Sequence, residues 1–467
     1  MNRYFGVFAA ACALGLLAPA ATGAAALKSV AQSSREDAPV SEDLSGAHLA
    51  FRYARDYPTI PYNGVAADNP VARLQAKLNS GAVRLEFKAP RGYLDSVLAA
   101  LKIDASSQTL VYSKTSLQIE AINATTPRAI YFNDDTYVAW VQGDRMLEIV
   151  TVDAKLGAVF YTLPNHPGAQ VRVAREASRC LTCHDTFSMM GGGVPQFRFT
   201  STQVNVNGEG LSEQPGIETT DETPLAQRWG GWYVSGRTGH LPHLGNILVH
   251  DAKEMAARTP AQQQDYDSLD GLLDVRPYLT NKSDVVALLV LEHQAYIHNL
   301  ITRANFKSRT LLAKVESAQN VDALRWGALS SQSLASLRRL LEPMVRAMLF
   351  VDAAGMNGGI ASTSGFDRWF QAQPPQDRQG RSLRDLDLNT RLFRYRLSYL
   401  IYSPGFEGLP GCVKEFVYMR LGEILNGRDQ APAFAALSAQ ERTDIRQILL
   451  DTKPAYARFA AATRPVQ

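Results

Sequence analysis

The amino-acid sequence predicts an α+β fold: an N-terminal, mostly antiparallel β domain, then a loop-rich segment, then a C-terminal α-helical domain. Residues 48–165 contain short runs rich in β-branched and aromatic side chains, separated by turn-forming residues. Residues 166–282 contain glycine-rich stretches that do not suit long regular elements. From residue 283 onward, apolar residues recur with the helical period. Strands followed by helices are typical of an α+β protein.

Six short runs are predicted to form the strands of the β domain. They occupy residues 82–87, 109–112, 129–132, 137–141, 147–152 and 158–161. Residues 133–135 and 142–144 are predicted hairpin turns, because they are rich in Asn, Asp and Gly. Turns this short join antiparallel strands. One helix is expected near residues 94–103.

Five helices are predicted in the C-terminal domain. They span residues 284–303, 333–350, 389–402, 412–425 and 438–450. Ser283 is a suitable N-cap for the first helix, and Ser438 with Glu441 forms a capping box for the last. A shorter helical turn is expected at residues 174–178.

The first 24 residues have the pattern of a secretory signal peptide. Arg3 supplies a positive charge, residues 4–17 are apolar, and residues 18–24 are mostly small, as cleavage requires. The apolar run is too short to span a membrane comfortably. Residues 25–47 are mostly small, polar or charged and are expected to form a flexible linker. The sequence therefore predicts a chain that is exported from the cytoplasm and loses this segment by cleavage.

Composition and charge fit an ordinary globular protein. The 467 residues carry a formal net charge of +3, which favours neither nucleic-acid binding nor strong adsorption to a membrane. No transmembrane segment is expected in the mature chain, because the apolar run 285–291 ends at Glu292 and His293. The length suffices for two or three domains.

Residues 180–184, Cys-Leu-Thr-Cys-His, have the form C-x-x-C-H, the attachment signature of a c-type haem. Cys180 and Cys183 can form thioethers to the porphyrin, and His184 is then the proximal ligand of the iron. A C-x-x-C pair can also belong to a zinc site or to a thioredoxin-like redox pair. The sequence has no second cysteine cluster for zinc, and export agrees with haem attachment outside the cytoplasm. One covalent haem c is therefore expected.

Cys412 has no expected partner if the other two cysteines of the mature chain carry haem. It lies in an apolar segment, which predicts a small buried residue. Cys12 lies within the predicted signal peptide and is expected to be removed.

The ligand on the opposite side of the iron decides the class of redox chemistry. A second strong ligand makes an electron carrier, whereas a vacant position admits small molecules. His243 is the first candidate, because it lies in a Gly- and Pro-containing loop that follows two tryptophans. His293, on a predicted helix, is the second candidate, and His240 is the third. A structural role is the alternative for each.

Aromatic and basic residues before this loop suit the surroundings of a haem. Trp229 and Trp232 flank two glycines and are expected to form walls of the cofactor site. Arg228 and Arg237 are expected to pair with the haem propionates, because guanidinium groups bind carboxylates well. The alternative for both arginines is a solvated surface charge.

Several segments together resemble a family of exported bacterial mono-haem proteins described as cytochrome c domain-containing. The similar segments are residues 127–134, 157–163, 180–184, 228–234, 243–246, 291–299 and 398–403. They are spread over most of the mature chain, but only the C-x-x-C-H motif has a known chemical role. In the family, methionine often stands where this chain has Leu244, so one possible sulfur ligand is missing. The resemblance implies one haem of poorly defined activity.

Three functions are compatible with these observations. The first is electron transfer by a periplasmic mono-haem c-type cytochrome that exchanges electrons with periplasmic redox partner proteins. The second is a haem c oxidoreductase, peroxidase-like or oxidase-like, with an open distal site. The length of the chain favours this second function, since a carrier needs only about 100 residues. The third is a haem-based sensor or docking subunit. The export signal and the single haem motif favour the first.

Overall fold

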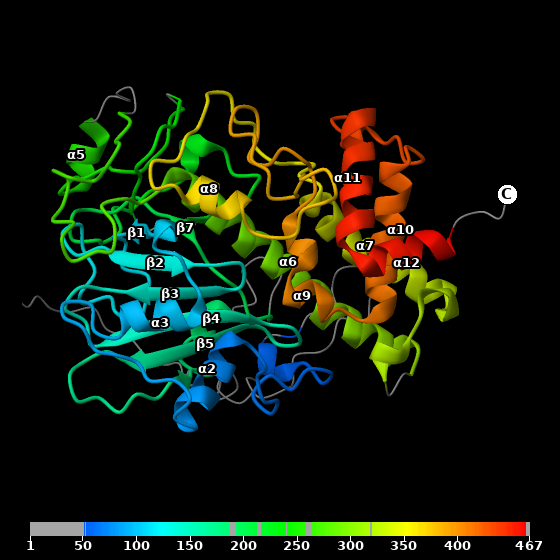
Figure 1. Cartoon of the computed structure of the whole chain (residues 1–467), viewed down its shortest axis with the longest axis horizontal. Helices are drawn as coiled ribbons and strands as arrows, with labels where there is room; N and C mark the ends of the chain where they lie inside the picture. Colours follow the sequence, from blue (N-terminus) through cyan, green and yellow to red (C-terminus); the bar gives the residue numbers. More distant parts are fainter. Residues whose placement is uncertain are drawn as a thin grey trace, which may run out of the picture. The chain divides into compact units, whose positions relative to one another are not determined.

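A seven-stranded antiparallel sheet dominates the N-terminal half of the structure (Figure 1). The computed structural model describes residues 51, 53–185, 193–212, 216–239, 241–257, 264–317 and 320–463. The predicted signal peptide and linker, residues 1–24 and 25–47, lie outside the described residues. The sheet and helices α2 to α12 make this a mixed α+β protein, as predicted.

Five consecutive strands form the middle of the sheet. They are β1 (Thr109–Val111), β2 (Arg128–Phe132), β3 (Thr136–Trp140), β4 (Met146–Asp153) and β5 (Gly157–Pro164). Each overlaps a predicted run. Asn133 forms the β2–β3 turn, because its side-chain oxygen accepts hydrogen bonds from the N–H groups of Asp135 and Thr136 at 3.3 and 3.0 Å. The turn predicted at residues 142–144 joins β3 to β4.

Alternation along the strands divides their side chains between two faces. Ile130, Ala139 and Glu148 are cross-strand neighbours on one face. On the other face, the hydroxyl of Tyr161 accepts a hydrogen bond at 3.0 Å from Asn69, the N-cap of α2 (Pro70–Asn79). The first of these faces forms part of the site described below.

Both edges of the sheet belong to the loop-rich segment. At one edge β6 (Ala174–Arg175) pairs with β5, and at the other edge β9 (Trp232–Tyr233) pairs with β1. The chain between them carries the C-x-x-C-H motif and a small sheet of β7 (Thr200–Ser201) and β8 (Ile217–Glu218). The motif therefore lies in a connection that leaves one edge of the main sheet and rejoins it at the opposite edge.

In this region two predictions were wrong and one helix was not foreseen. Residues 82–87 form no strand, because they are largely exposed and their backbone bonds go to neighbouring helices: Val83 N–H donates to the Lys77 carbonyl at 3.3 Å, and Glu86 N–H donates to the Ser96 hydroxyl at 3.1 Å. The helical turn expected at residues 174–178 is replaced by β6, which completes the sheet edge. Helix α2 was not predicted, although Asn69 caps it and Pro70 begins it.

Helix α6 (Val285–Val315) connects the sheet to the helical part of the protein. Asp284, rather than Ser283, is its N-cap, because the Asp284 carboxylate accepts from the N–H of Val286 at 2.9 Å. The Ser283 hydroxyl instead donates to the carbonyl of Tyr233 at 2.6 Å. Further along α6, the Gln294 amide donates to the backbone carbonyl of the β2–β3 turn at 3.0 Å. These contacts fix the helix against the sheet.

Several further α-helices accompany α6 in the described residues. They are α3 (Leu94–Leu101), α5 (Ala252–Ala257), α7 (Ser331–Met348), α8 (Phe366–Gln371), α9 (Pro404–Glu407), α10 (Gly411–Leu425), α11 (Ala439–Thr452) and α12 (Pro454–Ala462). Figure 1 shows α7, α10, α11 and α12 grouped on the side away from the sheet. Ser438 caps α11 by accepting from Glu441 N–H at 3.1 Å, as its sequence predicted.

The helix predicted at residues 389–402 was wrong except for a 3-10 turn at Tyr399–Tyr402. The Asp387 carboxylate accepts hydrogen bonds from the N–H groups of Asn389 and Thr390 at 2.9 and 2.8 Å. Such local side-chain bonds compete with helix formation. The resulting loop carries Ser398 to a buried position beside α6.

The three predicted parts of the chain share one hydrophobic core. It includes Val138 of the sheet, Trp232 of the loop-rich segment and Leu288 of α6. The predicted boundaries at residues 165 and 282 therefore do not separate independent cores, because β9 completes the sheet and α6 packs on it. None of the helices in the described ranges combines the length and apolar character needed to cross a membrane.

Candidate functional site

The C-x-x-C-H motif forms a single helical turn, α4 (Leu181–His184). The N–H groups of Cys183 and His184 both donate to the carbonyl of Cys180, at 3.2 and 3.1 Å. Residues three and four positions apart lie on the same side of a helical turn. Leu181 anchors the turn in the core, and the Arg198 guanidinium donates to the carbonyl of Cys183 at 3.0 Å. The two thiols and the imidazole are therefore presented together.

One hydrogen bond orients the imidazole of His184. Its Nδ1 lies 2.8 Å from the carbonyl oxygen of Gln196, and because a carbonyl only accepts, Nδ1 carries the proton. Nε2 is then unprotonated, and it has no hydrogen-bond partner among the described residues. Burial lowers the pKa of His184 to about 4, so the ring is neutral at neutral pH. A neutral imidazole oriented through its other nitrogen is the form that ligates metals.

A cavity of about 440 Å³ is lined by both this turn and the sheet. Cys180, Cys183 and His184 line it from the motif, and Phe199, Thr200 and Trp232 line it from the chain that crosses between the sheet edges. The sheet contributes Val111, Arg128, Ile130, Tyr137, Ala139, Glu148, Val150 and Phe160. The His184 ring also packs against Phe160, with 4.5 Å between the ring centroids. The thiols and the imidazole thus open onto a space walled by aromatic and aliphatic side chains.

The loop of residues 114–119 forms another part of the cavity wall. Two of its side chains, Leu117 and Ile119, line the cavity and yet are 40% and 42% exposed to solvent. Large apolar side chains left exposed beside a cavity are typical of a surface that a bound group covers.

Of the two tryptophans predicted as walls, only Trp232 lines this cavity. Its indole N–H donates to the carbonyl of Thr200 at 2.8 Å. Trp229 is buried elsewhere, with its ring 5.1 Å from that of His243. The reason is local: Trp229 has a left-handed backbone conformation, with φ of 70°, and so turns the chain before β9 begins.

Neither Arg228 nor Arg237 has the predicted place on the cavity wall. Arg228 is buried, with its guanidinium 2.9 Å from the Glu292 carboxylate and further hydrogen bonds to the carbonyls of Asp221 and Thr223. Arg237 is exposed. The prediction that these two arginines bind haem propionates is corrected, because one guanidinium is satisfied within the protein and the other is at the surface.

His243 is also absent from the residues that line the cavity. It is buried beside Trp229, and its Nδ1 accepts a hydrogen bond from the N–H of Gly245 at 3.0 Å. Burial lowers the pKa of His243 to about 4. The structure thus gives His243 a structural place rather than the predicted place at a distal ligand position. His240 lies outside the described residues.

His293 is the middle member of a buried series of three hydrogen-bonded polar side chains. Its Nδ1 lies 2.8 Å from the Asp221 carboxylate, and its Nε2 lies 2.9 Å from the Ser398 hydroxyl. The order Asp–His–Ser matches the triad of serine hydrolases. His293 and Ser398 are both 0% exposed, however, and Ser398 lines neither the cavity of the C-x-x-C-H turn nor a smaller cavity beside Asp221. With both nitrogens of His293 occupied, we assign this series of side chains a structural role and correct the prediction of His293 as an iron ligand.

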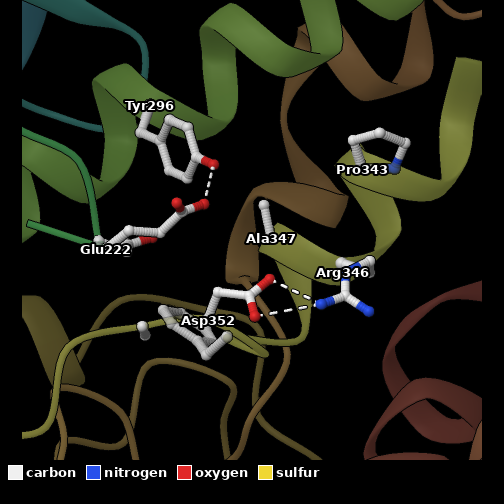
Figure 2. Close-up of a pocket in the computed structure, with 9 residues that line it drawn as sticks. Glu222, Tyr296, Pro343, Arg346, Ala347 and Asp352 are labelled. Atoms are coloured by element: carbon white, nitrogen blue, oxygen red, sulfur yellow. Dashed lines mark hydrogen bonds and ion pairs between the residues drawn. The ribbon is translucent and has the colours of Figure 1, made fainter. Parts of the chain in front are cut away.

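A second cavity, of about 160 Å³, lies beside Asp221 between α6 and α7. Figure 2 shows two polar pairs on its wall. The Tyr296 hydroxyl donates to Glu222 at 2.8 Å, and Arg346 donates to both oxygens of Asp352 at 3.1 and 2.9 Å. Because these polar side chains pair with one another, this cavity does not indicate a ligand.

The three cysteines in the described ranges carry free thiols. Cys412 is 0% exposed, which confirms the predicted small buried residue, and burial raises its pKa to about 11. Burial also raises the pKa of Cys180, to about 12, whereas Cys183 is exposed. Within the described part of the chain, no three His, Cys, Asp or Glu side chains gather closely enough to hold a metal ion.

Comparisons of this chain with protein-family models, curated proteins and solved structures find no match. The resemblance to exported mono-haem proteins therefore stays a prediction that rests on the sequence segments alone.

Most of the cavity wall comes from residues that the sequence did not identify. The strands of the predicted β domain supply them, although that domain was not expected to form the site. One signal was present: Arg128 and Glu148 interrupt the apolar cavity face of β2 and β4. A charged residue on an otherwise apolar strand face needs a partner.

Proposed function

We propose that this chain is an exported mono-haem c-type redox protein, with haem bound to Cys180 and Cys183 and ligated by His184. The observation that carries the proposal is the shared cavity: both thiols and the imidazole of the C-x-x-C-H turn line one space of about 440 Å³. A C-x-x-C-H sequence that faced solvent or a packed core would lack this support.

Three features of the residues fit a haem. The cavity volume lies within the range of cofactor sites, about 300 to 1,000 Å³. Its walls include Tyr137, Phe160, Phe199 and Trp232, which suit a flat apolar ring. The exposed apolar residues of the 114–119 loop would be covered by the edge of such a group.

A bound haem would supply one-electron redox chemistry. The protein would supply attachment, orientation and exclusion of water. The Gln196 carbonyl holds the His184 ring in one tautomer, and Phe160 packs against its face. Cys183 is exposed, so one side of the attachment point lies near the surface. Electron exchange with periplasmic redox partner proteins would use that side.

Turnover of a small molecule at the iron is the second candidate function, and one observation favours it. Among the described residues that line the cavity, His184 is the sole histidine, and methionine is not represented. The described wall therefore offers neither a second histidine nor a methionine, the two common second ligands of electron-carrying haems. An accessible sixth position suits peroxidase-like or oxidase-like chemistry.

Carbon monoxide binding separates the two candidates. We expect the reduced haem protein to bind carbon monoxide rapidly and with one-to-one stoichiometry at neutral pH, because no described lining residue competes strongly for the iron. The Soret band measures this binding. A reduced protein whose spectrum does not change with carbon monoxide would have a sixth protein ligand, for which His240, outside the described residues, is a candidate, and would be an electron carrier.

A further inference from the structure

Among the described residues, four cationic side chains line the cavity: Lys114, Arg128, Arg179 and Arg198. Two of the arginines are satisfied by the protein. Arg179 donates two hydrogen bonds to Glu176, at 3.1 and 2.7 Å. Arg198 donates to Glu218 at 2.7 Å and to the carbonyl of Cys183 at 3.0 Å. Both guanidinium groups therefore have directional partners within the protein.

Arg128 differs from them. Its side chain is only 18% exposed, and the closest ion-pair distance to Glu148 is 3.5 Å. The Nε of Arg128 and the Oε2 of Glu148 are both buried and have no hydrogen-bond partner among the described residues. A buried N–H donor without a hydrogen bond is costly, and native proteins rarely leave one so. Arg128 therefore has unused donors beside the cavity.

The strand fixes where these donors lie. Arg128 begins β2, and Ile130 follows two residues later on the same face of the sheet. This face lines the cavity. The antiparallel neighbour of Arg128 on β1 is Val111, another cavity residue. Because successive strand residues alternate between faces, Arg128 cannot turn to the opposite side of the sheet without a shift of register.

We propose that Arg128 binds a carboxylate of the haem, one of its two propionates, in the cavity. This inference rests on the proposed function, because the haem supplies the carboxylate. A guanidinium pairs with a carboxylate through two parallel N–H···O bonds, which would use the donors that Glu148 leaves free. Glu148, on the same face of the sheet and separated from β2 by β3, lies 3.5 Å from the Arg128 guanidinium.

The pairing has a redox consequence. A fixed positive charge near the iron stabilises the reduced state relative to the oxidised state, since reduction removes one positive charge from the iron. Replacing Arg128 by an uncharged residue should therefore lower the midpoint potential. It should also change the bending vibration of the propionate that loses its partner.

The test compares Arg128→Gln with Arg237→Gln, an exposed arginine that does not line the cavity. Haem content is measured first, by intact mass. Resonance Raman then reports the propionate bending band, and a redox titration reports the potential. We expect one haem in both variants, a shifted propionate band and a lower potential in Arg128→Gln, and wild-type values for both in Arg237→Gln.

The outcomes distinguish a failure of the proposed haem function from a failure of the role of Arg128. Wild-type protein without haem would overturn the proposed function itself. Wild-type protein with haem, together with an unchanged propionate band and potential in Arg128→Gln, would overturn only the role of Arg128. If Arg128→Gln fails to mature, Arg128→Lys replaces it: the charge is kept, so the potential should hold while the band shifts, and an unchanged band would overturn the inference.

Discussion

Replacing His184 by alanine is expected to leave the haem attached to Cys180 and Cys183 but to change the absorption spectrum of its iron completely. The thioethers do not need the imidazole, whereas the electronic state of the iron depends on its axial ligand. The Soret and charge-transfer bands measure the effect. The Gln196 carbonyl, which accepts the Nδ1–H bond in the wild type, remains in place to orient an imidazole added from solution. Added imidazole should therefore restore much of the wild-type spectrum.

His250→Ala is the matched control for this variant. His250 is exposed, its charged neighbour is Glu254 at 3.1 Å, and it does not line the cavity. Its replacement should leave the spectrum as it is. If His184→Ala retained the wild-type spectrum, His184 would not be the proximal ligand, and the central assignment of the site would fail.

Replacing His293 by alanine is expected to destabilise the protein by about 3 to 5 kcal/mol. The ring stacks on Phe350, with 4.8 Å between centroids, and bonds to Asp221 and Ser398. Its removal leaves a void and deprives a buried carboxylate and a buried hydroxyl of a partner. Each orphaned buried group costs about 1 to 3 kcal/mol.

Urea unfolding of the haem-containing protein measures this loss, with His250→Ala again as the exposed control. The midpoint should fall markedly for His293→Ala and stay near that of the wild type for His250→Ala. The haem spectrum of folded His293→Ala should match that of the wild type. A normal midpoint with an altered spectrum would instead place His293 at the iron, contrary to the structural role assigned to it.

The regular elements were predictable where short-range chemistry determines them. The β2–β3 turn followed from Asn133, whose side chain bonds to the backbone of the turn itself. The start of α11 followed from Ser438 and Glu441 in the same way. Both signals act within four residues. The predicted helix at residues 389–402 does not form, because Asp387, two residues before its expected start, accepts hydrogen bonds from the N–H groups of Asn389 and Thr390 and redirects the chain.

The site was predictable only at the motif. Cys180, Cys183 and His184 are contiguous, so their spacing alone brings them together. The opposite wall comes from strand residues such as Arg128 and Glu148, which meet across the sheet through register rather than through sequence proximity. Trp229 and His243 follow the motif in a loop that suits a cofactor wall, yet they pack on each other. The periodicity of a sequence does not show which face of a sheet a distant loop covers, because tertiary packing decides that.

Intact-mass analysis of the protein matured in a bacterial periplasm tests the central claim most directly. The chain, produced together with the machinery that attaches haem c, should gain the mass of one haem. The variant with both Cys180→Ala and Cys183→Ala should gain none, while Cys412→Ala, which removes a buried thiol outside the cavity, should gain one as the wild type does. A folded wild-type chain that emerges from the periplasm without haem would contradict the account.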